Sequence, residues 1–197
     1  MYNYPMAEIG LRERSKARRR AAIIRAAYEL FAERGYDATT VADIAEAAEV
    51  APRTVAMYFP AKQDIALSRF SDGAASLSTA LRDRQPGERL HDVFGRWLLD
   101  SQTDPEDRDM YRLASRMFSA NPDLRALRAA RMAAAIREGA AMIADETGSL
   151  PDAIASRIAA AAAAAIAMEI IDTEPGAERE EAVAAAMRFL EGGTAAL

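Results

Sequence analysis

The amino-acid sequence predicts an all-α protein. Between sparse glycines and prolines, apolar residues recur every three or four positions over most of the 197 residues, which is the period of an amphipathic helix. No alternating run of Val, Ile and Thr stands beside an Asn-Gly or Asp-Gly turn, so the signals of a β-hairpin are missing. Hydrophobic residues make up 51% of the chain, which is enough for a substantial core.

Three helices are predicted in the first part of the chain. The first covers about residues 11–34, and Gly35 ends it because glycine tolerates a positive φ. The second begins at Thr40, whose hydroxyl can cap free backbone N–H groups, with Asp43 in support three residues on. The third begins near Pro52, a residue that suits the first helical position. Their expected buried residues are Ile23, Ala27, Leu30, Phe31, Val41, Ile44, Ala45, Ala48, Val50, Val55 and Phe59.

A longer helix is predicted over about residues 62–82, and Gln85-Pro86-Gly87 breaks it. Beyond this break the pattern predicts a bundle of five helices with short loops. These helices cover about residues 88–101, 106–119, 122–146, 151–172 and 177–191. The loops between them contain Thr103-Asp104-Pro105, Asn121-Pro122, Gly148-Ser149-Leu150-Pro151 and Glu174-Pro175-Gly176. The predicted domains are residues 11–61 and residues 62–197, the second of which includes the linking helix.

Charge is distributed unevenly along the chain. The formal net charge is −5, yet residues 1–70 hold 11 Lys and Arg against 9 Asp and Glu, whereas residues 71–197 hold 14 against 21. Between Arg12 and Arg25, seven basic side chains accompany Glu13 as the single acidic one. Such a local positive field suits a phosphate backbone, although a solvated basic helix would show the same pattern.

The composition argues against several classes of function. The absence of cysteine excludes disulfides, thiolate metal sites and cysteine nucleophiles, and His91 is the only histidine. With no paired-carboxylate or Gly-rich phosphate motif either, we expect no enzyme, no cofactor and no metal site. The N-terminus lacks the apolar segment of a signal peptide, and the longest uncharged run, Ile158 to Met168, is shorter than a membrane span. We therefore expect a cytoplasmic protein without a membrane partner.

The stretch TTVADIAEAAEVAPRTVAMYFPAKQDI, residues 39–65, has the spacing of a helix-turn-helix. A capped short helix is followed by a tight connection at residues 48–51 and by a second short helix. Small alanines allow the two helices to cross closely. The outward face of the second helix combines base-edge donors, a surface for methyl contacts and a hydroxyl that can reach phosphate. This face carries Arg53, Thr54, Met57 and Tyr58.

The segment TTVADIAEAAEVAPRTVAMYFPAKQDIAL, with IIRAAYELFAERGYDATT upstream of it, resembles the signature of TetR-family transcriptional regulators. The resemblance covers roughly residues 15–70 and extends to the hydrophobic positions, the helix caps and the Tyr-Phe-Pro-x-Lys segment. It implies a three-helix DNA-binding domain, a linking fourth helix, a variable helical ligand-binding domain and a homodimer built largely by the last two long helices. The partners it implies are double-stranded DNA, a second copy of the chain and a small-molecule effector.

The resemblance also implies roles for individual residues. The residues expected at DNA are Thr40 on a phosphate, Arg53, Thr54 and Met57 at the bases, and Tyr58 and Lys62 on the backbone. Tyr58 could instead be a core aromatic. Three positions depart from the family pattern: Glu49 where glycine is usual, Ala51 where a capping serine is common, and Ala56 where an aromatic is frequent. Glu49 must then either adopt a left-handed conformation or belong to an altered turn.

Apolar and aromatic residues gather between positions 94 and 118, which allows two interpretations. They can be ordinary bundle core, or they can line a ligand pocket, as the resemblance implies. The candidate ligand-binding residues are Phe94, Trp97, Leu98, Met110, Leu113, Met117 and Phe118. The candidate dimer seam consists of Ile154, Ile158, Ala161, Ala162, Ala165, Met168 and Ile171 on one helix and Val183, Met187 and Leu190 on the next.

The sequence thus predicts a sequence-specific DNA-binding transcriptional regulator, acting as a homodimer on a pseudo-palindromic operator. Repression relieved by a ligand fits these features, and so do activation and corepression. Two alternatives differ in class. In one, the protein is a helical small-molecule-binding protein or enzyme whose first domain is only structural. In the other, it binds DNA without regard to sequence.

Overall fold

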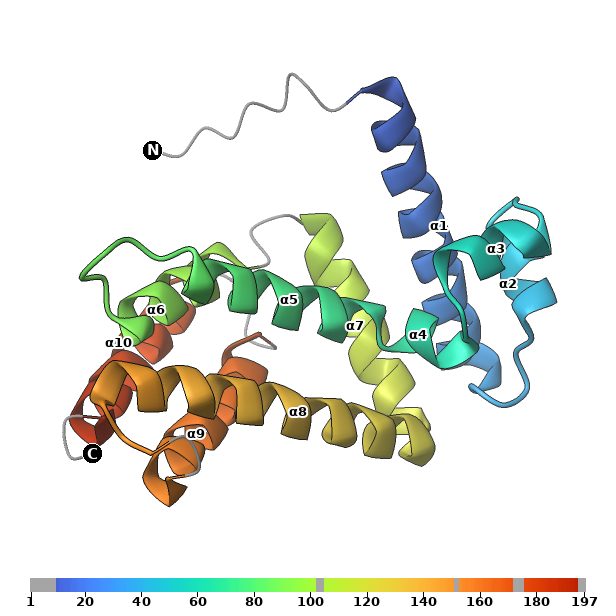
Figure 1. The fold of residues 1–197 in the computed structure, drawn as a ribbon. Coiled ribbons are helices and arrows are strands. Elements are labelled where there is room, and N and C mark those ends of the chain that lie inside the picture. The colour runs from blue at the N-terminus through green and yellow to red at the C-terminus, as the bar shows by residue number, and fades with distance from the viewer. Residues whose placement is uncertain (1–9, 102–104, 151–152, 172–175, 195–197) are drawn as a thin grey trace. The chain divides into compact units, whose positions relative to one another are not determined.

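The computed structural model describes residues 10–101, 105–150, 153–171 and 176–194 (Figure 1). Every regular element within these ranges is an α-helix, so the all-α prediction is confirmed. The predicted loop residues Thr103, Asp104, Pro151, Glu174 and Pro175 lie outside the described residues. The helices in chain order are α1 (Leu11–Arg34), α2 (Val41–Ala47), α3 (Pro52–Tyr58), α4 (Lys62–Ala66), α5 (Ser68–Arg82), α6 (Leu90–Asp100), α7 (Pro105–Ala120), α8 (Pro122–Thr147), α9 (Ile154–Ile171) and α10 (Ala177–Thr194).

The first three helices form where the sequence predicts them. α1 ends because Gly35 has a φ of 90°, and the Gly35 N–H donates to the Phe31 carbonyl at 3.2 Å. α2 follows Thr40 and α3 starts at Pro52. The predicted core residues that are buried are Ile23, Ala27, Leu30, Phe31, Ile44, Ala45, Val55 and Phe59. Val41, Ala48 and Val50, which were also expected inside, are half-buried.

The prediction of one helix over residues 62–82 is wrong. α4 ends at Ala66 and α5 begins at Ser68, with Leu67 in a turn between them. The hydroxyl of Tyr28, on α1, donates to the Ala66 carbonyl at 3.1 Å. Because this side chain satisfies the buried acceptor, α4 can end here without leaving this carbonyl unpaired. Leu67, in the turn, is 1% exposed.

The described residues divide into two compact units. Unit 1 consists of the chain up to Ser68 together with Arg112–Leu124, and so contains α1 to α4 and most of α7. Unit 2 consists of Arg69–Tyr111 and Arg125–Leu197 and contains α5, α6, α9, α10 and nearly all of α8. α7 therefore contributes residues to both units.

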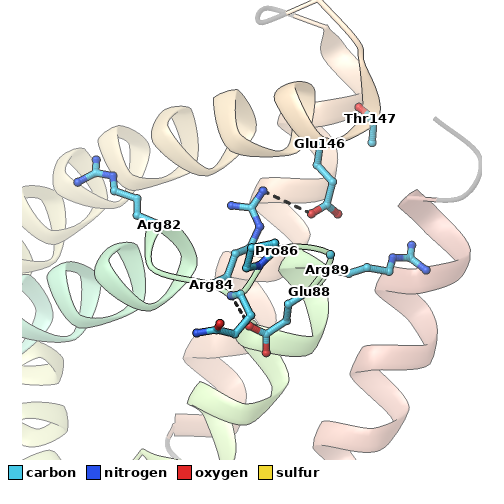
Figure 2. Close-up of a pocket in the computed structure, with 9 residues that line it drawn as sticks. Arg82, Arg84, Pro86, Glu88, Arg89, Glu146 and Thr147 are labelled. Carbon is cyan, nitrogen blue, oxygen red and sulfur yellow. Dashed lines mark hydrogen bonds and ion pairs between the residues drawn. The ribbon is translucent and has the colours of Figure 1, made fainter.

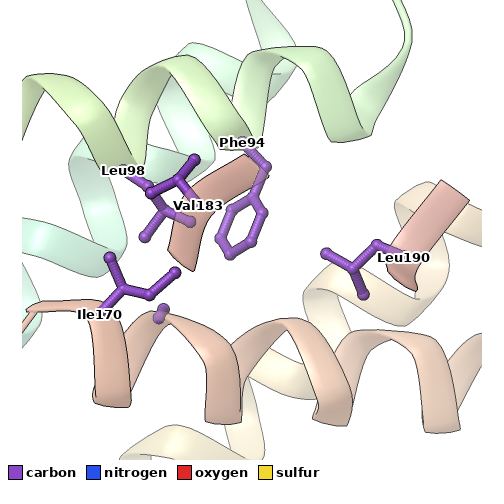
Figure 3. Close-up of a cluster of buried hydrophobic side chains, with 6 residues drawn as sticks. Phe94, Leu98, Ile170, Val183 and Leu190 are labelled. Carbon is purple, nitrogen blue, oxygen red and sulfur yellow. The ribbon is translucent and has the colours of Figure 1, made fainter. Parts of the chain in front are cut away.

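The core of unit 2 lies where α6, α9 and α10 meet. Figure 3 shows Phe94 and Leu98 of α6 pointing toward Ile170 of α9, with Val183 and Leu190 of α10 in the same cluster. All five side chains are at most 6% exposed. Their burial within a single chain supplies the apolar driving force that holds these three helices together.

The packing of α10 corrects the predicted dimer seam. Val183 and Leu190 are buried inside the chain, and Met187 packs against the same core. α6 approaches α10 so closely at Gly95 that a Cβ at this position would lie 2.9 Å from the Met187 sulfur. Val183 and Leu190 are therefore not available to a second copy, whereas Met187 is half-buried against the same core.

α9 is the most apolar helix among the described residues. Its 18 residues have a mean hydropathy of 1.8 and only 17% of them are buried. By length and composition alone α9 could cross a membrane, in contrast to the sequence-based expectation, and one such helix is weak evidence for a membrane span. Its buried side holds Ala160, Ala167 and Ile170, while Ile154 and Ile158 on the other side are 72% and 64% exposed.

Candidate DNA-binding site

The N-terminus of α2 is held by a reciprocal pair of hydrogen bonds. The Asp43 N–H donates to the Thr40 hydroxyl at 3.1 Å, and the Thr40 N–H donates to the Asp43 carboxylate at 2.7 Å, which confirms the predicted cap. The Thr40 hydroxyl also donates to this carboxylate at 2.7 Å. The hydrogen bonds from the Thr40 backbone and side chain lower the pKa of Asp43. Thr40 is exposed at the surface, but its polar groups already bind Asp43.

The turn between α2 and α3 contains a residue with a left-handed backbone. Glu49 has a φ of 52°, and it is the only non-glycine residue with a positive φ among the described parts of the chain. The Val50 N–H then donates back to the Ala45 carbonyl at 2.9 Å, which closes the end of α2. Of the two possibilities left open at Glu49, the structure therefore has the left-handed one.

α3 presents a mixed face beyond its buried side. Val55 is fully buried, whereas Arg53 and Met57 are exposed, the latter by 71%. Thr54 and Tyr58 are half-buried at the edges of that face. The helix starts without a side-chain cap because Ala51 has no acceptor, as the sequence predicts. The predicted base-reading positions thus lie on the part of α3 that faces away from the core.

Lys62 lies at the α1–α2 turn rather than free at the surface. Its ammonium donates to the carbonyls of Tyr36 and Thr39 at 2.7 and 2.9 Å. It also sits 4.1 Å from the centre of the Tyr36 ring, within the range of a cation–π contact. Lys62 therefore ties the start of α4 to the loop that precedes α2, a structural role that the sequence did not indicate.

The same loop is held by a residue from the end of α7. The Tyr36 N–H donates to the Asn121 side-chain oxygen at 2.9 Å, and the Asn121 amide donates to the Met117 carbonyl at 2.7 Å. The Tyr36 ring packs against Phe31 with centroids 5.1 Å apart. Sequence reasoning missed this contact because its partners are 85 positions apart and Asn121 reads as an ordinary loop residue before a proline.

The basic N-terminal half of α1 is largely exposed. Its exposed cationic residues are Arg12, Arg14, Lys16, Arg18 and Arg19. Arg20, one turn further on, places its guanidinium 5.3 Å from the centre of the Phe59 ring, at the end of α3. The predicted positive field therefore lies on a helix that contacts the candidate recognition helix.

The seven predicted ligand-binding residues do not form one described site. Phe94 and Leu98 belong to the packed core of unit 2, and Trp97 stacks on Phe94 with centroids 6.2 Å apart. Met110, also in unit 2, is 6% exposed. The other three, which belong to unit 1, are Leu113, Met117 and Phe118.

A described cavity of about 510 Å³ lies elsewhere in unit 2, between the α5–α6 loop and the end of α8 (Figure 2). Its lining is polar and mainly charged. Arg84 lies 3.9 Å from Glu146, and the Gln85 N–H donates to Glu88 at 3.1 Å. None of the seven predicted ligand-binding residues lines this cavity.

Comparison with known proteins finds similarity to a family of bacterial regulators. Residues 23–68 match the model of bacterial regulatory proteins of the tetR family. The chain is 36% identical over 123 residues to the HTH-type transcriptional regulator TcmR of Streptomyces glaucescens, and the match spans 58% of this chain and about half of TcmR, 54%. Over these residues the chain is similar to TetR-family regulators.

Solved structures with a similar fold cover nearly the whole chain. GusR of Salmonella enterica superposes with a TM-score of 0.64 at 19% identity, covering 95% of this chain and 98% of GusR. NalD of Pseudomonas aeruginosa, the secondary repressor of the MexAB-OprM multidrug efflux pump, has a TM-score of 0.58 at 20% identity over 89% of this chain and 96% of NalD. At these identities the likeness concerns the fold alone.

These matches confirm the resemblance stated from the sequence. The segment that contains the helix-turn-helix matches the TetR-family model, and the all-helical fold of the whole chain is similar to that of GusR. The family model and TcmR describe regulators of transcription rather than enzymes. The matched residues 23–68 end at the same Ser68 that ends the first segment of unit 1.

Proposed function

We propose that this protein is a sequence-specific DNA-binding transcriptional regulator that acts in the cytoplasm as a homodimer and responds to a small-molecule effector. One observation carries the proposal. α3 exposes Arg53 and Met57 on a helix that is anchored by Val55 and preceded by the capped helix α2, inside the segment that matches the TetR-family model. A helix held in this way can enter a major groove with its side chains at base edges.

In this proposal, one group of residues contacts the bases and another contacts the phosphate backbone. Arg53 donates to base acceptors, while Thr54 and Met57 contact neighbouring base edges. Thr40, Tyr58 and Lys62 lie along the phosphate backbone, where contacts fix the register. Two carbonyls occupy Lys62, yet an ammonium has three N–H donors, so one remains for a phosphate. The basic half of α1 adds attraction that does not depend on sequence.

The homodimer would use the face that α9 leaves exposed. Ile154 and Ile158 lie on this face, and Phe189 of α10 is 65% exposed. Exposed apolar side chains of this size mark interaction surfaces. In a dimer, two α3 helices could reach successive major grooves, roughly 34–36 Å apart. This arrangement makes the operator pseudo-palindromic.

Repression is the proposed outcome of DNA binding, and NalD, which shares the fold, is a repressor. An effector bound in unit 2 would favour a conformation in which the two α3 helices no longer match the groove spacing. DNA and effector would then each weaken the binding of the other by the same factor, as thermodynamic linkage requires.

The experiment is DNase I footprinting of the purified full-length protein on the promoter region beside its own gene. We expect protection of a discrete inverted repeat whose half-sites are about one helical turn, or a multiple of one turn, apart. Arg53→Ala serves as the matched control for specific contact. Uniform protection of the fragment would contradict the proposal and favour a non-specific DNA-binding protein, and no protection at all would favour a helical protein whose first domain is only structural.

A further inference from the structure

Arg179 is a buried cation in the first turn of α10. It is 3% exposed, and its Nη2 donates to the carbonyls of Leu98 and Ser101 at 2.6 and 2.8 Å. Both carbonyls belong to the C-terminal end of α6, where backbone acceptors lack helical partners and the helix dipole is negative. These two bonds fix the guanidinium in place.

The rest of this guanidinium has no partner among the described residues. Its Nε and Nη1 are buried and make no hydrogen bond, and no described carboxylate pairs with Arg179. Burial lowers the pKa of Arg179 below its usual value, and only the charge of Tyr111 opposes this effect. Four other arginines of unit 2 differ, because each lies beside a glutamate: Arg82 beside Glu138, Arg84 beside Glu146, Arg89 beside Glu191, and Arg96 beside Glu88.

Capping α6 does not account for this arrangement. Nη2 alone satisfies the two carbonyls, so the Nε and Nη1 N–H groups are buried without being needed for the cap. Leaving a buried charge without a counterion is costly, and an anion brought to it recovers that cost. A guanidinium is also the cation best suited to carboxylate oxygens, because its planar donors match their geometry.

We propose that Arg179 binds the carboxylate of a small organic acid, with its Nε and Nη1 N–H groups as donors, and that such an acid is the effector of unit 2. The second part rests on the proposed function, because it assumes a ligand-responsive regulator. The surroundings favour a carboxylate over a phosphate. Leu98 and Phe94 make this region apolar, and Arg179 is a single cation, so a dianion would lose more hydration than one guanidinium could replace.

The chain carries its own reporter for this binding. Trp97 is the only tryptophan, and it directly precedes Leu98, whose carbonyl Arg179 binds. Its backbone carbonyl accepts from the N–H of Ser101, the second residue that Arg179 binds. We therefore expect an anion that binds Arg179 to disturb this end of α6 and to change the emission of Trp97.

The experiment titrates the full-length protein with sodium hexanoate and sodium benzoate, and in parallel with hexanamide and benzamide, which have the same shape without the charge. Sodium phosphate and sodium chloride at equal ionic strength complete the set. Thermal unfolding is followed for all probes, and Trp97 emission for the hexanoate pair. We expect the carboxylates to raise Tm in a saturable way and hexanoate to change the emission, while the amides and chloride do neither.

Three variants locate the binding. Arg179→Met should abolish the response to carboxylate, and Arg179→Lys, which keeps the charge but loses the planar donors, should weaken it about tenfold or more. Arg188→Met is the matched control, because Arg188 is an exposed arginine on the same helix, and it should respond like the natural chain. If Arg179→Met does not fold, Arg179→Lys and the amide comparison still decide the matter.

Several outcomes would overturn the assignment. If carboxylates raise the Tm of Arg179→Met as much as that of the natural chain, they bind elsewhere. If they change neither the Tm nor the emission of the natural chain, Arg179 is only a helix cap. A response to phosphate equal to that of carboxylate removes the organic acid as the ligand class. Neither readout uses DNA, so these outcomes are separate from the footprinting test. Carboxylate binding without any effect on operator affinity would retain the site and reject its role as effector site.

Discussion

At the scale of single residues, the α2–α3 turn contains backbone strain. Glu49 holds a φ of 52°, a region that costs a residue with a Cβ about 1 kcal/mol or more. Glycine removes this cost and adds only the entropy of a more flexible unfolded chain. The strain therefore gives a way to test the geometry of the turn by stability alone.

We expect Glu49→Gly to raise the free energy of unfolding by roughly 0.5–1 kcal/mol, because it relieves the left-handed backbone. Urea denaturation followed by circular dichroism measures this change. Glu46→Gly is the matched control, since Glu46 lies inside α2, where glycine should lower stability by about 1 kcal/mol. A loss of stability in Glu49→Gly would contradict the left-handed turn.

Variants of Lys62 and Arg53 should distinguish residues that hold the domain and bind phosphates from residues that read the base sequence. Lys62→Met removes the ammonium that binds the Tyr36 and Thr39 carbonyls, so it should lower the free energy of unfolding by about 1–2 kcal/mol. It should also weaken binding to all DNA and reduce the salt dependence by about one phosphate. Denaturation together with binding titrations at several salt concentrations measures both effects.

Arg53→Ala is the complementary variant. Because Arg53 is exposed on α3, its removal should leave stability within about 0.5 kcal/mol of the natural chain. It should reduce discrimination between the operator and operators with single base changes, by about 1–3 kcal/mol at the contacted position. Equal losses of affinity for the operator and for random DNA would remove Arg53 from the base-reading residues.

For Lys62→Met, an unchanged salt dependence of DNA binding would leave Lys62 with its structural role alone.

At the scale of helices, contacts between distant elements decide how the DNA-binding unit is held. α7 supplies residues to both compact units, and Asn121, just beyond its end, binds the backbone of Tyr36 in the loop before α2. Tyr28 of α1 similarly donates to the Ala66 carbonyl at the end of α4. Each of these contacts determines the position of a helix that carries or adjoins a proposed DNA contact.

We expect Asn121→Ala to expose the Tyr36 amide, because it removes the acceptor of that N–H. Hydrogen exchange at Tyr36 should become faster, and the free energy of unfolding should fall by about 1–2 kcal/mol. Asn121→Asp is the control, since it retains an acceptor oxygen and should protect the Tyr36 amide better than alanine does. Equal exchange in both variants and in the natural chain would mean that this bond does not hold the loop.

At the scale of the whole molecule, the exposed side of α9 is the surface on which the proposed homodimer depends. Ile158→Glu places a charge at a position that is 64% exposed in the single chain, so the monomer should fold normally. In a dimer the same charge would be buried without a partner and should shift the protein toward monomers. Light scattering coupled to size-exclusion chromatography measures the mass in solution.

Leu99→Glu provides the control for this variant. Leu99 is 45% exposed on α6, a different helix from α9, so the substitution should leave the dimer intact. Operator binding by Ile158→Glu should weaken in parallel with the loss of dimer, because a single α3 contacts only one half-site. A protein that remains dimeric with Ile158→Glu would place the interface elsewhere.

The sequence by itself determined the features that depend on neighbours along the chain. Gly35 ends α1, Thr40 with Asp43 starts α2, Pro52 starts α3, and the helical period places Ile44 and Val55 inside. Caps, glycines and hydrophobic periodicity act within one or two helical turns, so their pattern is visible in a single sequence. The departure at Glu49 was visible in the same way, but the sequence left a left-handed residue and an altered turn open, and the structure has the left-handed residue.

Only the tertiary structure decided what depends on distant partners. Lys62 bonds to a loop more than twenty positions earlier, Asn121 binds Tyr36 across 85 positions, and Arg179 meets the end of α6 across 81 and 78. The sequence also could not show which apolar residues are buried and which are exposed. Leu190, for example, is buried by helices far from it in sequence. These choices follow from how helices pack, and the energy of packing depends on which surfaces meet rather than on the local pattern that forms each helix.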